Sequence, residues 1–394
     1  MKKNVIISAD PYVMFDEKRQ CYYCYSTNDS ENKAFSIHKS TNLQDWVFVN
    51  YALDLTHPNI WGKDWFWAPE CYYNSNNNHY YLFYSARVKN ELTTKYFFEE
   101  DYEESCKIGI AVSKSPEGPF VNLTSEPLDF SPFDFDYLHI NDIADNVFEL
   151  EDNLLLAKAS QGSYIPAIDA NLFIDHNRMV LYFSRCCYRN CRYDDEFKRF
   201  IEASNVACVE LDTAWWFDKE AKMMPTIKKE YITYDEKGRR RDKFITLISY
   251  QTEAQAWENA HVDDYNIYQK KRKNRRWSEG GTTFPLVIDG KIKYGMTYSC
   301  NCYEDSDYAV GIAFADNPMG PFKKYELNPI IKAIDGGVCS TGHGSLVYHN
   351  EEWYYFLHAR LDVGQPRILC YTKLFFQNSQ ILSDEIVVCN SIDK

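Results

Sequence analysis

Four stretches of the chain are rich in aromatic and aliphatic residues, and each follows a short polar segment. They are residues 79–85, 179–184, 293–299 and 353–358. Aromatic and β-branched residues favour strands, and polar turns such as residues 74–78 and 289–291 reset the backbone between strands. The pattern predicts four similar hairpins and an all-β protein.

A weak internal repeat supports this interpretation. Residues 36–46, 110–120 and 312–322 each begin as a strand, turn through small polar residues and end on an aromatic residue. The first two copies end 74 positions apart, at Trp46 and Phe120, and the later part of the chain has room for more divergent units. Sheet units repeated at a fixed interval are typical of β-propellers. We therefore expect residues 1–394 to form a single five-bladed β-propeller domain.

Residues 212–273 depart from this rhythm. They contain Trp215-Trp216, a helix-like segment at residues 253–260, and most of a basic run at residues 270–276. We expect a partly helical insertion or an elaborated blade here rather than a separate domain. A basic run can bind nucleic acid, but this one lies inside an acidic protein, and a solvated loop is the favoured interpretation.

Composition narrows the range of partners. The 43 Lys and Arg against 57 Asp and Glu give a net charge of −14, which repels nucleic acid and anionic membranes. No apolar run approaches the roughly 20 residues of a membrane helix, and the apolar part of the first ten residues is too short for a signal peptide. We expect a cytoplasmic protein with a neutral ligand and without nucleic-acid or membrane partners; the residues do not indicate the oligomeric state.

The 13 cysteines are expected to be reduced thiols. Cys21 and Cys24, and the group Cys186, Cys187 and Cys191, are the candidates for zinc ligands. Cys21 and Cys24 lie in a strand-like run that would point them to opposite faces, and no second Cys/His pair has the spacing of a zinc site. Buried thiols are the favoured interpretation.

Three acidic motifs carry the candidate chemistry: Ala9-Asp10-Pro11, Ile168-Asp169-Ala170-Asn171 and Ser278-Glu279-Gly280-Gly281. Each places one carboxylate at the edge of an apolar or aromatic strand-like run. Carboxylates so far apart in sequence can meet in a fold that arranges its sheets around a common axis. A cluster of acids in a cleft is what the cleavage of a glycosidic bond requires.

The order of the motifs resembles glycoside hydrolase family 43, five-bladed propeller enzymes that act on arabinosyl and xylosyl linkages. The motifs that carry the resemblance, over nearly the whole chain, are Asp10-Pro11, Trp67-Ala68-Pro69, Ile168-Asp169 with Leu172-Phe173 and Asp175, Glu279-Gly280, and Thr341-Gly342-His343-Gly344. Each motif is weak alone, and the ordered set is specific. The resemblance implies a glycoside hydrolase with three catalytic acids.

The resemblance implies a role for each acid. Asp10 is the general base that deprotonates water, Glu279 is the general acid, and Asp169 orients that acid and raises its pKa. The family's usual prolines after the second and third acids are replaced by Ala170 and Gly281. Asp145, in an upstream near-copy of the Asp169 motif, is the alternative third acid.

The resemblance also implies supporting residues. Trp67 would form an apolar wall for the sugar, although a core tryptophan is the alternative, and Arg185 and Arg360 could bind sugar hydroxyls or lie on the surface. His343 lies in the turn that in relatives is near a calcium ion or water cluster at the axis. A structural calcium and a metal-free, hydrogen-bonded histidine are equal alternatives, and no cofactor is expected to be required.

These expectations combine into a function: hydrolysis with inversion, releasing terminal α-L-arabinofuranosyl or β-D-xylosyl residues from small plant-derived oligosaccharides. An intracellular enzyme meets imported oligosaccharides rather than polymers, which favours terminal cleavage over endo-arabinanase activity. Two other classes stay open. One is an invertase-like retaining hydrolase, whose Asn-Asp-Pro and Arg-Asp-Pro motifs are absent. The other is a propeller that binds carbohydrate without turnover.

Overall fold

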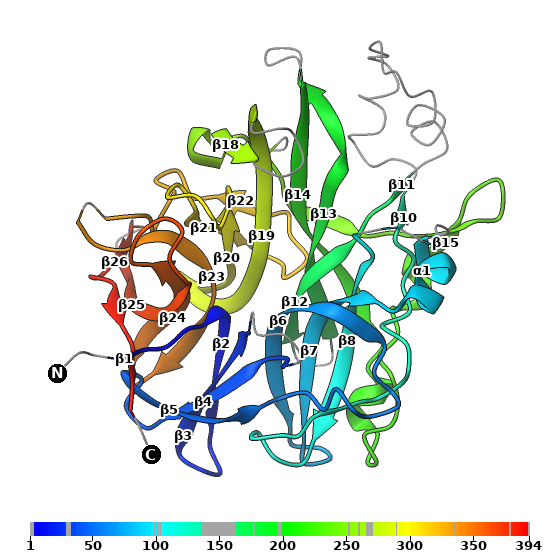
Figure 1. Ribbon diagram of the computed structural model, residues 1–394, viewed down its shortest axis with the longest axis horizontal. Coiled ribbons are helices and arrows are strands. Elements are labelled where there is room, and N and C mark those ends of the chain that lie inside the picture. Colours follow the sequence, from blue (N-terminus) through cyan, green and yellow to red (C-terminus); the bar gives the residue numbers. More distant parts are fainter. Residues whose placement is uncertain are drawn as a thin grey trace.

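The computed structural model describes residues 4–28, 33–97, 100, 102, 104–134, 163–175, 178–194, 199–250, 253–258, 261–264, 271–288, 290–334, 336–377 and 380–392. Its strands form a five-bladed β-propeller, as the sequence predicts (Figure 1). The innermost strand of each blade contacts the innermost strands of both neighbouring blades, so the five surround a common axis.

Each blade is a meander of antiparallel strands that runs outward from the axis. Blade 1 contains β2 (Ala9–Asp16), β3 (Cys21–Thr27), β4 (Ser36–Ser40) and β5 (Asp45–Tyr51). Blade 2 contains β6 (Gly62–Asn74), β7 (His79–Val88), β8 (Cys106–Ser113) and β9 (Val121–Asn122). Blade 3 contains β12 (Ala167–Asp175), β13 (Arg178–Asp194), β14 (Arg199–Leu211) and β17 (Ile245–Ile248).

The last two blades follow the same plan. Blade 4 contains β19 (Lys271–Ile288), β20 (Lys291–Cys300), β21 (Ala309–Ala315) and β22 (Lys323–Lys324). Blade 5 contains β23 (Cys339–His349), β24 (Glu352–Arg360), β25 (Ile368–Gln377) and β26 (Gln380–Ser383), with β27 (Val387–Val388) also paired to β25. The four predicted hairpin strands are the second strands of blades 2 to 5, and the three repeat copies begin on β4, β8 and β21.

Some short strands close the ring of blades, and others lie outside the four-stranded meanders. Near the C-terminus, β28 (Asn390–Ser391) pairs in parallel with β5 and antiparallel with β1 (Asn4–Val5), so both ends of the chain join blade 1 (Figure 1). The remaining strands are β10 (Phe133–Asp134), β11 (Ser163–Tyr164), β15 (Ile232–Tyr234), β16 (Arg240–Asp242) and β18 (His261–Asp264).

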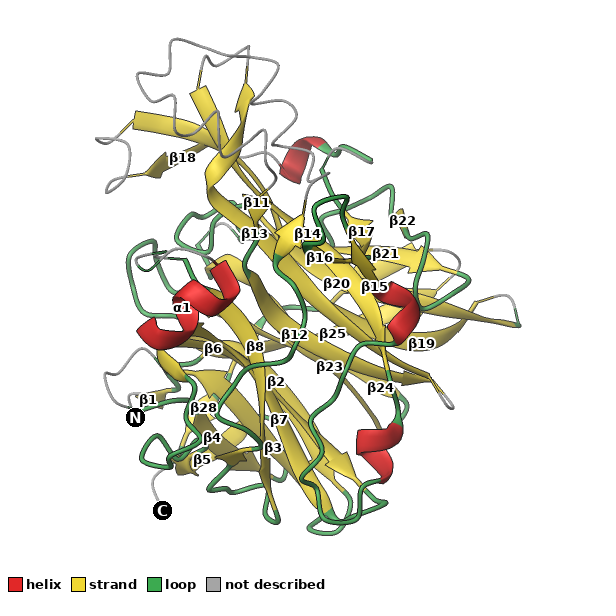
Figure 2. Cartoon of the chain, turned by 90° about the vertical axis from the view of Figure 1, so that its right-hand side faces the viewer, coloured by secondary structure: helices red, strands yellow, loops and turns green. Residues whose placement is uncertain are grey.

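The described part of residues 212–273 contributes to blade 3. Strand β17 from this region pairs antiparallel with β14 and supplies the fourth strand of blade 3. Strands β13 and β14 continue well beyond the propeller, where β18 and β19 lie beside them (Figure 2).

Helix is sparse and short in the described residues. The described part of residues 212–273 contains 3₁₀ helices at Ala214–Phe217, Lys229–Tyr231 and Ala256–Glu258. Within the helix expected at residues 253–260, the described residues 253–258 form a 3₁₀ turn at Ala256–Glu258, which a buried ion pair of 2.7 Å between Glu258 and Lys324 fixes to blade 4. The α-helix α1 (Asn90–Phe97) lies between β7 and β8, where no helix was predicted.

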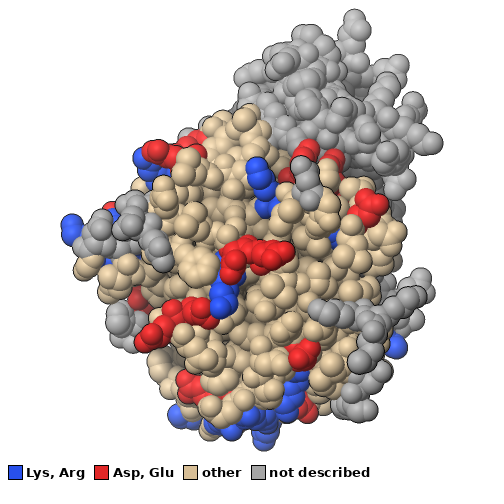
Figure 3. All heavy atoms as spheres, turned by 90° about the vertical axis from the view of Figure 1, so that its left-hand side faces the viewer, with Lys and Arg blue, Asp and Glu red and all other residues tan. Residues whose placement is uncertain are grey.

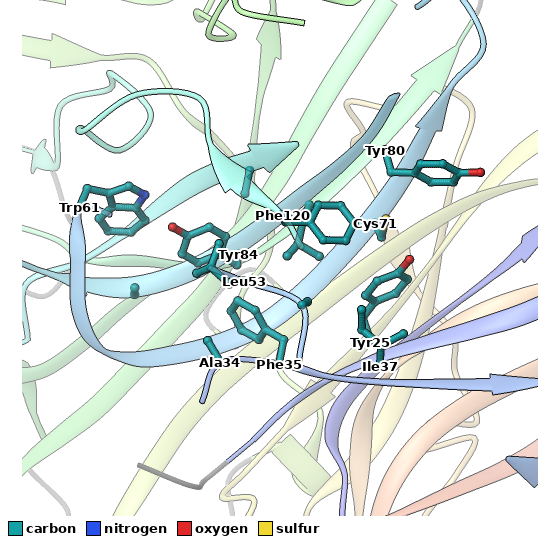
Figure 4. Packing of buried hydrophobic residues seen from close by; sticks show 14 of the residues in the cluster. Tyr25, Ala34, Phe35, Ile37, Leu53, Trp61, Cys71, Tyr80, Tyr84 and Phe120 are labelled. Atoms are coloured by element: carbon teal, nitrogen blue, oxygen red, sulfur yellow. The ribbon is translucent and has the colours of Figure 1, made fainter. Parts of the chain in front are cut away.

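Aromatic side chains fill the space between blades 1 and 2 (Figure 4). Trp61 stacks on Tyr84, with ring centroids 5.4 Å apart and 17° between the planes. The indole also lies directly over Gly109, where a Cβ atom would come within 2.3 Å of it. Glycine is therefore required on β8 for this close approach.

The two cysteines of β3 lie on opposite faces of the sheet, as the alternation of side chains along a strand predicts. Cys21 belongs to the core cluster between blades 1 and 2, whereas Cys24 packs with Trp46 and Phe356 on the other side of the sheet. Eleven cysteines are described, all of them free, and ten of these are buried. Cys187 and Cys191 lie where side chains are not described.

On the face of the molecule shown in Figure 3, acidic and basic side chains of the described residues lie close together, so this face is neither uniformly acidic nor uniformly basic. Within the described ranges, no helix has the length and apolar character needed to cross a membrane.

Candidate active site

The site begins with a backbone irregularity that recurs in every blade. The pairing of each innermost strand with the next strand shifts register at one to three points, as at a β-bulge. In each blade, one such bulge contains a positive-φ residue that lines a shared cavity: Asp10 (49°), Ala68 (47°), Asp169 (58°), Gly280 (60°) and His343 (39°). Non-glycine residues rarely adopt this conformation, and they concentrate at functional sites.

A ring of hydrogen bonds to side chains replaces the strand-to-strand backbone hydrogen bonds that the bulges interrupt. At each bulge the backbone N–H of the positive-φ residue donates to a side chain on the second strand of the preceding blade. The pairs are Asp10 with His358 Nδ1 (3.2 Å), Ala68 with Thr27 Oγ1 (2.9 Å), Asp169 with Ser85 Oγ (2.9 Å), Gly280 with Ser184 Oγ (3.2 Å) and His343 with Ser299 Oγ (2.8 Å). The ring links all five blades and satisfies buried donors that would otherwise be costly.

The bulges turn the chain toward one cavity. Asp10, Asp169, Gly280 and His343 all line it, together with Glu70 of β6. Glu279 precedes Gly280 and is 9% exposed. Three sequence-remote acids are thus brought to the same end of the axis. Asp145, the alternative third acid, lies outside the described residues.

Asp10 is surrounded by positive and hydrogen-bonding groups. Arg367 Nη1 lies 3.1 Å from Oδ1, the Thr27 hydroxyl donates to Oδ2 at 2.7 Å, and His343 Nδ1 is 3.6 Å from Oδ1. Burial alone would raise the pKa of Asp10, but Arg367, His343 and His358 outweigh it and hold the pKa far below its ordinary value. Asp10 is therefore an ionised carboxylate.

Asp169 has the opposite electrostatics. Its Oδ2 accepts a hydrogen bond of 2.8 Å from the Ser184 hydroxyl. Burial, together with the charge on Asp10, raises the pKa of Asp169 to about 7, although Ser184 and the Gly280 N–H oppose the rise. Asp169 thus changes its charge near neutral pH.

Both carboxylate oxygens of Glu279 are held. The Trp277 indole N–H donates to Oε2 at 2.6 Å, and the Tyr308 hydroxyl donates to Oε1 at 2.6 Å. Burial and then the neighbouring Asp169 raise the pKa of Glu279, against the opposing effects of His343 and the two hydrogen bonds. This environment favours the protonated form, as a general acid requires.

The predicted sugar-binding residues are less closely grouped. Trp67 stacks on Trp65 with ring centroids 5.0 Å apart and packs against the cluster that contains Trp277, so it lies beside the acids. The Arg185 guanidinium lies over the Phe244 ring, and Arg360 donates from Nε to the Tyr303 carbonyl at 3.3 Å. Among the described residues, the cavity lining includes neither arginine.

Four residues of the site were missed: Glu70, Trp277, Tyr308 and Arg367. Trp277 lies two positions before Glu279, and this spacing on one strand face could have indicated the contact. Glu70 directly follows the Trp67-Ala68-Pro69 motif, so the sequence could also have indicated it. Tyr308 and Arg367 precede β21 and β25, outside every motif, and only the folded chain brings them to the acids.

The described residues do not fit a metal held by side chains. No group of three or more His, Cys, Asp or Glu among them is placed to bind an ion. The donors nearest His343 are already engaged, since Asp10 is paired with Arg367 and Thr27. Calcium prefers six or more oxygen ligands, so a structural calcium at His343 stays a prediction, and no step below uses one.

Comparisons with known proteins, like the arrangement of the acids, indicate a glycoside hydrolase. The model of glycosyl hydrolases family 43 matches residues 3–148. A thermostable family-43 glycoside hydrolase of known structure is 26% identical, with a TM-score of 0.65, over 97% of this chain and 94% of that chain. An endo-1,4-β-xylanase from Bacteroides thetaiotaomicron is 24% identical, with a TM-score of 0.63, over 99% of each chain.

More distant structures share the fold. An endo-arabinase from Bacteroides thetaiotaomicron is 17% identical, with a TM-score of 0.57, over 96% of this chain and 100% of that chain. No curated protein matches the chain.

Proposed function

We propose that this chain is a family 43 glycoside hydrolase that releases terminal α-L-arabinofuranosyl or β-D-xylosyl residues from small oligosaccharides, with inversion at the anomeric carbon. The family-model match over residues 3–148 and the similar family-43 structure support the proposal. The observation that carries the proposal is the division of charge among acids at one end of the axis. Asp10 is held ionised, while Glu279 is favoured in its protonated form. Opposite environments for two carboxyl groups are the signature of a base and an acid that work together.

The proposed reaction uses these states directly. Asp10 takes a proton from a water molecule, and the oxygen of that water attacks the anomeric carbon from one face of the sugar. Glu279 gives its proton to the departing glycosidic oxygen on the other face, so the bond to the leaving sugar breaks without a free alkoxide. Asp169 contributes by opposing ionisation of Glu279.

The endo-xylanase and endo-arabinase among the similar structures favour internal cleavage as the second candidate. A cytoplasmic location stays a prediction that rests on the composition and the reduced cysteines.

A single assay series tests substrate and stereochemistry together. Aryl α-L-arabinofuranoside and β-D-xyloside are compared with linear arabino- and xylo-oligosaccharides, and proton NMR records the first-formed anomer. We expect single pentoses with inverted configuration. Longer first products would establish endo cleavage, and a retained anomer would exclude the roles given to Asp10 and Glu279.

Variants test the roles separately. Asp10→Ala should lose most activity on every substrate. Glu279→Ala should lose most on natural linkages and less on aryl glycosides with acidic leaving groups, since these leave without protonation. Glu326→Ala, at an exposed acid outside the cavity, is the matched control. Near-normal turnover by Asp10→Ala or by Glu279→Ala on natural linkages, with folding verified by circular dichroism, would contradict the assignment.

A further inference from the structure

A fourth carboxyl group lines the cavity, and the reaction proposed above does not use it. Glu70 lies on β6, two residues beyond the bulge at Ala68, and faces the same cavity as Asp10 and Asp169. It is the contribution of blade 2 to a set of acids that otherwise comes from blades 1, 3 and 4.

The two oxygens of Glu70 have different surroundings. Oε2 accepts a hydrogen bond of 2.9 Å from the Asn171 amide and another from the Tyr72 hydroxyl. Tyr72 is itself oriented, because its oxygen accepts the Leu172 N–H at 2.7 Å. Oε1 has no hydrogen-bond partner within the part of the chain that the structure describes.

This asymmetry decides where a proton resides. Oε2 already accepts two donors, so a proton on the carboxyl group belongs on Oε1. Burial raises the pKa of Glu70 to about 8, and the charge on Asp169 adds to this, while Tyr72 and Asn171 oppose it. At neutral pH, Glu70 is therefore a neutral acid with an O–H group.

The contacts around Glu70 are rigid. Asn171 is held from its other end, since its Oδ1 accepts the Thr283 N–H of blade 4 at 3.2 Å. Blades 2, 3 and 4 thus fix the orientation of one carboxyl group. Such preorganisation is typical of a group that recognises a ligand.

We propose that Glu70 is a sugar-binding residue of the active site, whose Oε1–H donates a hydrogen bond to a hydroxyl oxygen of the pentosyl group in the cavity. The proposal rests on the proposed function. The ionised Asp10 can only accept hydrogen bonds, so a sugar hydroxyl that donates to it still needs a donor elsewhere for its own lone pairs. Glu70 supplies that donor without adding another charge to the cavity.

Two substitutions distinguish hydrogen-bond donation by Glu70 from a role in packing alone. Glu70→Ala should raise KM on the preferred aryl pentoside by about tenfold or more, because a buried hydrogen bond is lost. Glu70→Gln should recover most of this loss, because the amide oxygen can accept from Tyr72 and Asn171 while the NH₂ group donates into the cavity. A Gln variant as impaired as the Ala variant, or an unchanged KM in Glu70→Ala, would overturn the proposal.

The pH profile provides a readout that packing would not change. Wild-type kcat/KM should decline near pH 8 partly because Glu70 loses its donor proton, whereas the amide of Glu70→Gln does not titrate. The ratio of Glu70→Gln to wild-type kcat/KM should therefore rise from pH 6 to pH 9. A flat ratio would contradict donation by the carboxyl group.

Deoxy substrates test direct contact. In the wild type, one 4-nitrophenyl monodeoxy pentoside should lose affinity relative to its parent, and Glu70→Ala should not distinguish the two. Equal penalties in both proteins would place Glu70 away from the sugar. If the wild type hydrolyses no pentoside, the proposed function fails; binding of free arabinose and xylose to wild type and Glu70→Ala, measured by calorimetry, then decides the role of Glu70 separately, and equal affinities would refute it.

Discussion

The space between blades 1 and 2 and the axis of the propeller are built in contrasting ways. Between the blades, Trp61 and Tyr84 stack on each other, and small residues such as Gly109 allow close contact. At the axis the strands are interrupted by bulges, and polar side chains bind the released N–H groups. The first region uses apolar packing to hold the blades together, and the second uses strained backbone to aim acids at one cavity. Substitutions in the first region should therefore change stability alone, whereas substitution of the acids in the second should also change chemistry.

The largest expected effect is at the axis. Asp10→Asn and Glu279→Gln keep the shape of the side chain but remove the base or the acid, and kcat/KM on oligosaccharides should fall by about 10²- to 10⁴-fold. Circular dichroism and thermal unfolding at pH 7 establish that each variant is folded. If both variants retain activity within tenfold of wild type, the axis is not where the chemistry occurs.

The matching test in the core is Trp61→Ala. Removal of the buried indole leaves a cavity beside Tyr84, and the free energy of unfolding should drop by about 3–5 kcal/mol. KM and kcat, measured at a temperature where the variant is folded, should stay close to wild type. Urea unfolding measures the first quantity, and Trp61→Phe should lose less. A large loss of kcat in the folded variant would show that the two regions are coupled.

Asp10 and Asp169 should affect the pH dependence of stability with opposite signs. The lowered pKa of Asp10 adds stability above the unfolded pKa of 3.8, and this is lost as the pH falls through the folded pKa. The raised pKa of Asp169 means that its favourable contribution, present below 3.8, is lost as the pH rises to about 7. Each effect is on the order of a few kcal/mol.

Two variants make this comparison measurable. From pH 4 to pH 8, Asp169→Asn should gain stability relative to wild type, because it lacks a buried group that must ionise. Asp10→Asn should instead differ from wild type by a nearly constant amount from pH 4 to pH 8, because Asp10 is ionised in both the folded and the unfolded wild type there. Its loss of stability relative to wild type should develop below pH 4, as the pH rises and the unfolded chain loses its proton while the folded Asp10 is already ionised and paired with Arg367. Urea unfolding at several pH values records both differences. Parallel curves for the two variants would contradict the assigned environments.

The sequence predicts the two regions to different extents. The strands of the blades follow from local patterns, and the motifs around Asp10, Ala68, Asp169, Gly280 and His343 each coincide with a bulge of their blade. Local pattern cannot supply contacts that are made across the axis. The environments of Asp10 and Glu279 depend on Arg367 and Tyr308, which directly precede β25 and β21 and lie outside every motif. Local pattern likewise does not supply the buried ion pair with Lys324 that fixes the 3₁₀ turn at Ala256–Glu258 to blade 4.

The smallest expected effect concerns two serines of the axial ring. Ser184 accepts the Gly280 N–H and also donates to Asp169, whereas Ser85 accepts the Asp169 N–H. Each Ser→Ala change should cost about 0.5–1.5 kcal/mol of stability, measured by urea unfolding. Only Ser184→Ala should also raise the pKa of Asp169, because that hydroxyl stabilises the ionised carboxylate.

Since an ionised Asp169 opposes ionisation of Glu279, Ser184→Ala should alter the pH profile of kcat/KM near neutrality, and Ser85→Ala should lower stability alone. The two serines occupy equivalent positions in adjacent blades, so they form a matched pair in the same kind of hydrogen bond. Equal pH profiles for the two variants would mean that the axial ring holds the blades together without tuning the acids. Different profiles would mean that one ring of side chains both closes the propeller and sets the charges used for catalysis.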